Sequence, residues 1–113
     1  MKSKIVALSK NEDFKILINK SKIFNKYATI FFGKLKNKNS KKLNISFVTK
    51  KKIGNAVKRN KIKRRLRNIL NEAAMKFPLN FNYSYLVIAK TTMLNNEYAI
   101  IKEIMFEDFK KIK

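Results

Sequence analysis

The chain has 113 residues, of which 28 are Lys or Arg and 7 are Asp or Glu, so its net charge is +21, and it contains no His, Cys or Trp. A chain of about 110 residues forms one domain with one core, and a hydrophobic content of 45% indicates a folded protein rather than a disordered basic tail. The missing Cys and His exclude a disulfide framework, a thiolate zinc site, a Cys nucleophile and the commonest general base.

The first predicted element is a helix that follows Ser9. Ser9 and Glu12 have the spacing of a capping box, in which the two side chains close the start of a helix. We expect this helix to extend to about Asn19. Its apolar residues share one face: Phe14, Leu17 and Ile18.

Two strands are predicted next. Residues 27–32 (YATIFF) are rich in aromatic and β-branched residues, and residues 43–49 (LNISFVT) alternate between apolar and polar side chains. The polar, basic residues 33–42 between them indicate a hairpin loop. The composition leaves room for a third strand in this part of the chain.

A long helix is predicted over residues 56–76, because Pro78 marks its end. Residues 85–89 (YLVIA) are almost uninterruptedly apolar, which indicates a strand buried on both faces. A strand, helix, strand sequence places 43–49 and 85–89 parallel in one sheet, with the long helix as the crossover. A last helix, capped by Asn95 or Asn96, carries an apolar stripe: Ile101, Ile104, Met105, Phe109 and Ile112.

The positive charge is concentrated in the first two-thirds of the chain. Residues 14–71 contain no acid and hold 15 Lys and 4 Arg, hence +19, so only +2 is left for the other residues. The four Arg are Arg59, Arg64, Arg65 and Arg67, in a chain with 24 Lys. This clustering indicates a need for the guanidinium group, which binds phosphate bidentately and stacks on bases.

Helical periodicity divides the long helix into two faces. The apolar face contains Ile62, Leu66, Ile69, Leu70 and Ala73, and the opposite face contains Asn60, Lys61, Arg64, Arg67 and Asn71. Lys63 and Arg65 flank the apolar face. Arg59 points toward the apolar side, so we expect it to help hold the connection at residues 50–55 in shape.

Residues 51–67 (KKIGNAVKRNKIKRRLR) closely resemble the signature of the bacterial ribonuclease P protein component. Residues 8–14 (LSKNEDF) resemble that family's first helix, and residues 85–90 (YLVIAK) resemble its last strand. The resemblance covers about residues 8–109 of a single RNA-binding domain, 1–113, whose ends we expect to be flexible. Four residues depart from the family pattern: Ile18, Ser46, Lys50 and Lys61.

The resemblance implies an α+β sandwich in one domain, of order α-β-β-β-α-β-α, with a left-handed crossover through the basic helix. It implies the protein subunit of an endoribonuclease that removes the 5′ leader of precursor tRNA. In that family the RNA subunit carries the catalysis with Mg²⁺, so no catalytic residue and no metal site are expected in the protein. The implied partners are the catalytic RNA and precursor tRNA, without DNA or a membrane.

The residues expected to bind the catalytic RNA are those of the basic helix and the connection before it: Lys50, Lys51, Lys52, Lys58, Arg59, Asn60, Lys61, Lys63, Arg64, Arg65 and Arg67. A single-stranded leader needs aromatic platforms beside cations. The candidates for that cleft are Phe14, Lys15, Ile18, Tyr27 and Phe32.

Four other interpretations compete with this one. A protein nuclease would need His or clustered carboxylates, and the acidic pairs are limited to residues 12–13 and 107–108. A structural RNA-binding protein of ribosomal type fits the size and charge equally well, but does not predict the motif at 51–67. A DNA-binding module and a membrane-surface helix fit less well, because no helix-turn-helix pair is evident and the helix needs its apolar face for packing. Without a signal peptide or spanning segment, we expect a soluble, cytoplasmic protein.

Overall fold

A computed structural model of the chain describes residues 5–36, 38–95 and 97–112. The elements in chain order are β1 (Ile5–Val6), α1 (Lys10–Leu17), β2 (Ser21–Phe24), β3 (Ala28–Gly33), β4 (Leu43–Val48), the 3-10 helix η1 (Lys51–Ile53), α2 (Ala56–Lys76), β5 (Ser84–Ala89), the 3-10 helix η2 (Thr91–Asn95) and α3 (Tyr98–Lys111). The predicted α+β order is confirmed, and a two-residue strand precedes it.

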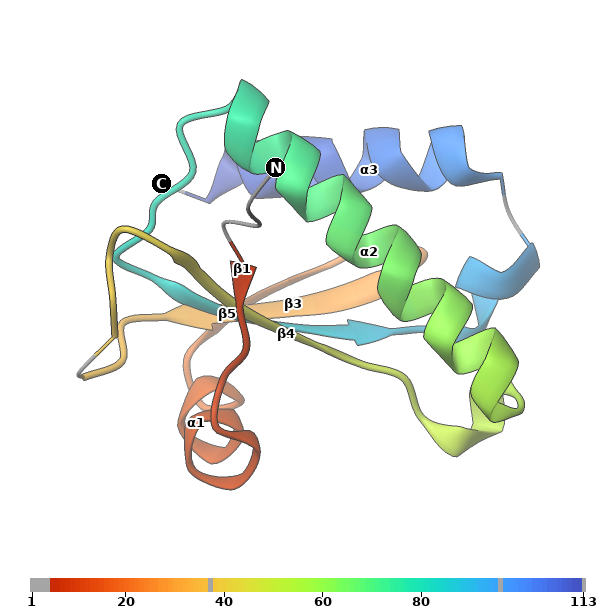
Figure 1. The fold of residues 1–113 in the computed structure, drawn as a ribbon, viewed down its shortest axis with the longest axis horizontal. Coiled ribbons are helices and arrows are strands. Elements are labelled where there is room, and N and C mark those ends of the chain that lie inside the picture. The colour runs from red at the N-terminus through yellow and green to blue at the C-terminus, as the bar shows by residue number, and fades with distance from the viewer. Residues whose placement is uncertain (1–4, 37, 96, 113) are drawn as a thin grey trace.

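The strands form one mixed sheet in the order β1-β4-β5-β3-β2. β1, β4 and β5 are parallel, whereas β3 is antiparallel to β5 and β2 is antiparallel to β3. α1 covers one face of the sheet, and α2 and α3 cover the other (Figure 1). The sheet therefore separates the surface formed by α1 from the surface formed by α2 and α3.

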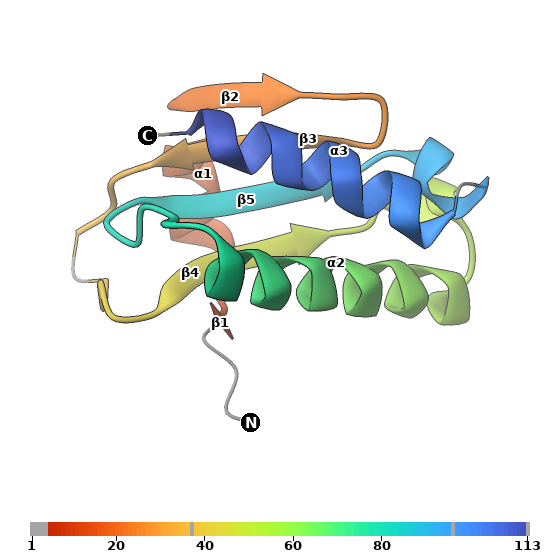
Figure 2. The same cartoon turned by 90° about the horizontal axis from the view of Figure 1, so that it is seen from above.

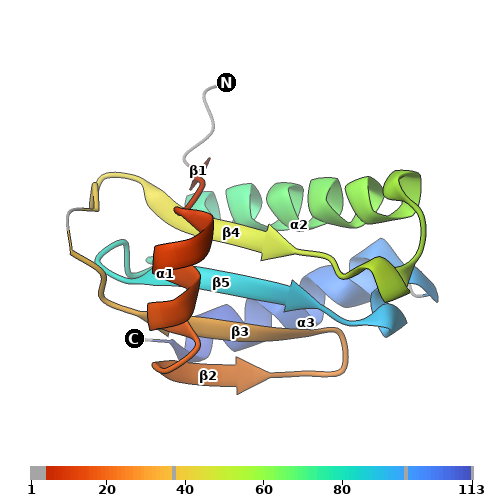
Figure 3. The same ribbon diagram turned by 90° about the horizontal axis from the view of Figure 1, so that it is seen from below.

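The crossover from β4 through α2 to β5 is left-handed. In Figure 2, where α2 lies in front and both strands point to the right, β5 lies above β4, and Figure 3 shows the same arrangement from the other side. Such connections are right-handed in almost all proteins. The left-handed crossover implied by the resemblance is thus present.

The predicted hairpin between residues 27–32 and 43–49 is wrong. β3 and β4 do not pair, because β5 lies between them and bonds to both. Four of the six β5 side chains in succession are buried, from Ser84 to Val87, and Ala89 is buried as well. A strand apolar on both faces is most stable at the centre of the sheet, and here it takes that place between the two earlier strands.

α2 has the predicted bounds, and its apolar face forms a large part of the main core. The five residues placed on that face by periodicity are the five buried ones: Ile62, Leu66, Ile69, Leu70 and Ala73. The Asn55 side chain caps the helix by accepting a hydrogen bond from the Lys58 backbone N–H at 3.0 Å. Gly54 precedes the cap with φ of 150°, a conformation that residues with a side chain rarely adopt.

α1 packs on the opposite face over a smaller cluster of Leu8, Leu17 and Leu86. The helix ends at Leu17 rather than Asn19, and Ile18 is 50% exposed, so the predicted packing of Ile18 is wrong. Ser9 is the N-cap as expected, but its side chain makes no capping bond. The Ser9 backbone N–H donates instead to Oδ2 of Asp13 at 2.8 Å, so Asp13 replaces Glu12 at the helix start.

α3 also begins differently from the prediction. Its N-cap is Glu97, without a side-chain capping bond, because Asn95 still belongs to η2; the other expected cap, Asn96, lies outside the described residues. The predicted apolar stripe is largely confirmed. Ile101, Met105 and Phe109 are buried against the sheet and α2.

Substitution of one buried residue of α2 tests its packing. We expect Leu66→Ala to lower the free energy of unfolding by about 2–5 kcal/mol, since the fully buried side chain leaves a cavity. Val57→Ala, on the same helix but 77% exposed, is the control and should change it by less than about 0.5 kcal/mol. Urea denaturation measures both, and equal effects would contradict the orientation of α2.

Glu72 joins α2 to α3 through Lys76 and Lys102, at 3.3 and 3.2 Å. The hydrogen bond from Lys102, followed by that from Lys76, lowers the pKa of Glu72 although desolvation opposes them. Its stabilisation is therefore present above the pKa of the unfolded chain and is lost as the pH falls through the lower folded pKa. We expect Glu72→Gln to be less stable by under about 1 kcal/mol at pH 7, and equally stable at about pH 3 in urea denaturation; a difference that persists in acid would contradict this ion-pair assignment.

Candidate nucleic-acid interface

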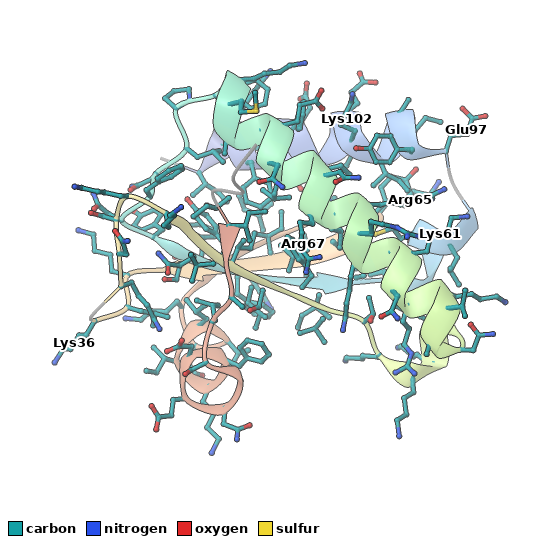
Figure 4. All side chains as sticks on the ribbon, viewed as in Figure 1. Lys36, Lys61, Arg65, Arg67, Glu97 and Lys102 are labelled. Carbon is teal, nitrogen blue, oxygen red and sulfur yellow. The ribbon has the colours of Figure 1, made fainter. Side chains whose placement is uncertain are left out.

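The outward face of α2 is a cationic surface. Lys58, Asn60, Lys61, Arg64 and Arg67 are exposed, and Lys63 and Arg65 are half-buried. Figure 4 shows Lys61, Arg65 and Arg67 along the helix. Among the described residues, the ion pairs involve other lysines: Lys38, Lys76, Lys102 and Lys111. The cations of this face are thus available to an external polyanion.

Two features extend this surface at the helix start. Lys50, Lys51 and Lys52 are exposed at η1, directly before α2. Lys58, Lys61 and Arg65 converge on a hollow of about 200 Å³ beside Leu94 of η2. Several cations around a concave surface suit the phosphate groups of a folded nucleic acid.

Arg59 differs from its neighbours. It is half-buried between the exposed Lys58 and Asn60, in agreement with its expected orientation toward the apolar side. Its Nε is buried and has no hydrogen-bond partner among the described residues. The side chain is therefore partly withdrawn from the outward face on which its neighbours lie.

A groove of about 630 Å³ connects the α2 surface with α1. Lys63 and Arg67 line it from α2, Phe14 lines it from α1, and residues 45–48 of β4 with Thr49 after them form its floor. Within the described residues, β1 pairs with Leu43 and Asn44 and no strand neighbours the edge of β4 beyond them, which leaves room for the groove. The groove therefore joins the predicted RNA-binding surface of α2 to the predicted cleft at α1, which the sequence treats as separate sites.

The structure brings three of the five cleft candidates together. Phe14 is half-buried, Lys15 is exposed and Ile18 is 50% exposed, all on or next to α1. Tyr27 is 2% exposed inside the main core, and Phe32 packs against the same core, on the sheet face opposite α1. These two residues do not share a surface with Phe14.

Phe31 is the aromatic residue of β3 that faces α1. It packs against the α1 cluster together with Phe14, Val48 and Ile88. Successive strand residues point to opposite faces, so selecting Phe32 instead of Phe31 reversed the face. In β3, buried Ala28 and Ile30 alternate with half-buried Thr29 and Phe31. Once it is known which face of the sheet α1 covers, this alternation assigns Phe31 to that face.

The acidic residues form no metal-binding cluster within the described ranges. No group of three or more His, Cys, Asp or Glu could hold a metal ion there. Asp13 binds Lys38 at 2.7 Å, and Asp108 accepts from Asn25 at 2.8 Å. In the part of the chain that the structure describes, no helix is long and apolar enough to cross a membrane.

Comparisons with known proteins agree with these features. The model of the family described as Ribonuclease P matches residues 3–113. The chain is 34% identical to the ribonuclease P protein component of Carboxydothermus hydrogenoformans, over 94% of this chain and 90% of that protein. It is 32% identical to the component of Mycoplasma mycoides subsp. mycoides SC, over the full length of both.

Solved structures with the same fold include two RNase P proteins. The protein from Thermotoga maritima superposes with a TM-score of 0.80 at 22% identity, covering 96% of this chain and 98% of that one. The protein from Staphylococcus aureus gives a TM-score of 0.77 at 24% identity, with 93% and 92% covered. These similarities extend to the whole domain, including the unusual crossover region.

Salt dependence tests the α2 surface. We expect Arg64→Ala combined with Arg67→Ala to lower the slope of log K against log salt for a structured RNA by about two units, since each neutralised phosphate contributes about 0.9. Lys76→Ala combined with Lys111→Ala removes the same charge from residues that already bind acids, and should leave the slope nearly unchanged. Filter binding over a range of salt concentrations distinguishes the two, and equal slopes would remove this face from the interface.

Proposed function

The chain belongs to the ribonuclease P protein family, and we propose that it binds the catalytic RNA of that enzyme through α2 and the 5′ leader of precursor tRNA on the α1 side of the sheet. As the protein component, it is the accessory subunit of the endoribonuclease that matures tRNA 5′ ends. RNA binding follows from membership of the family. The identity of each RNA at each surface is our proposal.

The assignment of α2 to the catalytic RNA rests on its convex cationic face. A large folded RNA offers many phosphate groups and few accessible base edges, so a protein binds it by charge and shape. The outward residues from Lys58 to Arg67, with Lys50, Lys51 and Lys52 beside them, supply that charge without internal partners among the described residues. We assign Arg59 a positioning role at this surface, through the start of α2.

The assignment of the leader to the α1 side rests on the groove and on the aromatic side chains that pack next to α1. Single-stranded RNA is bound by side chains on which bases stack, beside cations that follow the phosphates. Phe14 lines the groove, Phe31 packs against the same α1 cluster as Phe14, Lys15 lies on α1, and Lys63 and Arg67 provide cations at the groove. Thr49 also lines the groove, and its buried Oγ1 has no hydrogen-bond partner among the described residues. That the groove touches both surfaces is the observation that carries this proposal.

We further propose that Mg²⁺ serves the RNA subunit and not a site on the protein. Asp13 and Asp108, the acids that the fold buries, are engaged by Lys38 and Asn25, and the described residues offer no other acidic cluster. By neutralising phosphates at the interface, the protein would lower the Mg²⁺ concentration that the RNA needs. We place this activity in the cytoplasm, where the proposed partners act.

Reconstitution tests the proposed function. We expect the protein mixed with a bacterial ribonuclease P RNA at low Mg²⁺ to release the leader from precursor tRNA, while neither component alone does so. A Mg²⁺ titration with and without the protein should show a lower requirement in its presence. Binding no tighter than to an unrelated structured RNA, together with no cleavage, would contradict the proposal.

The leader assignment has a separate test. Phe14→Ala should weaken the affinity of the reconstituted enzyme for precursor tRNA about five-fold or more, since stacking contributes about 1–3 kcal/mol per base, with little change for mature tRNA. Ile16→Ala, on the same helix and 47% exposed, is the matched control. Equal losses for precursor and mature tRNA would place Phe14 outside the leader site.

A further inference from the structure

Phe24, at the end of β2, has a ring that the fold leaves uncovered. Its side chain is 69% exposed, and it is the one aromatic residue among those described that is exposed rather than buried or half-buried. Phe24 belongs neither to the residues assigned to the α2 surface nor to those assigned to the leader groove. Isolated exposed apolar residues are common on protein surfaces, so exposure alone carries no functional meaning.

The position of Phe24 on the sheet is informative. Its neighbour Ile23 pairs with Ile30 and packs on the main core, so Phe24, paired with Thr29, points to the α1 face. Phe31 lies on the same face, two residues after Thr29 in β3, which is about 7 Å further along the strand. α1 crosses the sheet at the end away from the arrowhead of β2 (Figure 3), and Phe24, the last residue of β2, is 69% exposed. An unpaired strand bound at Phe14 and Phe31 could therefore continue to Phe24 along one surface.

A cation is held over one face of the ring, while Phe24 as a whole stays 69% exposed. Nζ of Lys90 lies 5.5 Å from the centre of the Phe24 ring and donates a hydrogen bond of 2.7 Å to the backbone carbonyl of Asn25. The ammonium group is thereby fixed next to an aromatic platform instead of moving freely in solvent. An aromatic ring adjacent to a cation is the pair of groups that binds a nucleotide, through its base and its phosphate.

The turn that carries Phe24 is held in place from several sides. The backbone N–H of Lys90 donates to the Tyr27 carbonyl at 2.8 Å, and the Thr92 hydroxyl donates to the Lys26 carbonyl at 2.6 Å. Asn25 accepts from the backbone N–H groups of Tyr27 and Ala28 and donates to Asp108. The platform is consequently preorganised, and a base that stacks on it does not have to order the turn.

We propose that Phe24 and Lys90 form a second base-stacking platform for an unpaired nucleotide of the leader, at the end of the sheet remote from α1. This inference rests on the proposed function, because it extends the leader path beyond Phe14 and Phe31. It makes the preference of the enzyme for a leader depend on length. A leader long enough to reach Phe24 gains one stacked base that a short leader lacks.

Leader length provides the test. With the reconstituted holoenzyme, a series of precursor tRNAs with leaders of increasing length should show a step of increasing affinity that Phe24→Ala removes. The ratio of the affinities for long and short leaders should fall about five-fold, and Phe24→Trp should restore it. Ile100→Ala, an exposed apolar residue of α3, is the matched control. Thermal unfolding of each variant verifies that it is folded.

A fluorescent base gives an independent readout. A 2-aminopurine placed at the leader nucleotide where the affinity step occurs should be quenched on binding to the wild-type enzyme and not to the Phe24→Ala enzyme. If Phe14→Ala weakens leader binding while Phe24→Ala changes neither the step nor the quenching, the platform is contradicted and the proposed function stands. If the wild-type enzyme does not distinguish precursor from mature tRNA, the proposed function itself fails.

Discussion

The burial of one face of α2 against the sheet is the interaction on which the other features depend. Ile62, Leu66, Ile69 and Leu70 are fully buried there, and the burial of each such side chain contributes about 1.5–3 kcal/mol. With these residues inward, the guanidinium and ammonium groups at intervening positions must point outward. The same hydrophobic contact that folds the domain therefore creates its cationic surface, in a chain whose net charge of +21 opposes compaction.

The edge of β4 connects this surface to the other side of the sheet. Because β1 pairs with only two residues of β4, the remaining edge lies open between α1 and α2. A longer first strand would fill the groove that Phe14, Lys63 and Arg67 line. The left-handed crossover places α2 beside this edge (Figure 2). Two RNA segments bound to the two surfaces would meet at this groove, which brings a catalytic RNA next to the substrate leader.

The features that the sequence predicts well are those encoded locally. The bounds and the buried face of α2 follow from a helical repeat and its flanking residues, and the central strand β5 follows from its continuous apolar composition. The sequence wrongly predicts a hairpin between β3 and β4, because the pairing of these strands depends on a third strand that comes later in the chain. The residues of β2, Ser21–Phe24, have little apolar pattern of their own, so the sequence does not locate this strand.

The site residues show the same division. Helical periodicity predicts the outward orientation of the α2 cations, since this orientation depends on one helix alone. The sequence misplaces Phe32 and Tyr27 in the cleft, because a strand pattern defines two faces without indicating which one α1 covers. Phe24 and Lys90 come together only through the tertiary contacts of the β2–β3 turn with the end of β5, and nothing in their sequence spacing indicates it.

In the proposed function, the outward face of α2 contacts the catalytic RNA and the α1 side of the sheet contacts the leader, with Lys63 and Arg67 of α2 at the groove between them. Because the chain has no Cys, an iron chelate can be attached at a single introduced thiol, at Asn68→Cys on the exposed face of α2 or at Ile16→Cys on α1. In the reconstituted complex with precursor tRNA, radicals from the α2 position should cut the catalytic RNA, and radicals from the α1 position should cut the leader. A leader cut more strongly from α2 than from α1, with the reverse for the catalytic RNA, or the same cleavage pattern from both positions, would contradict this arrangement.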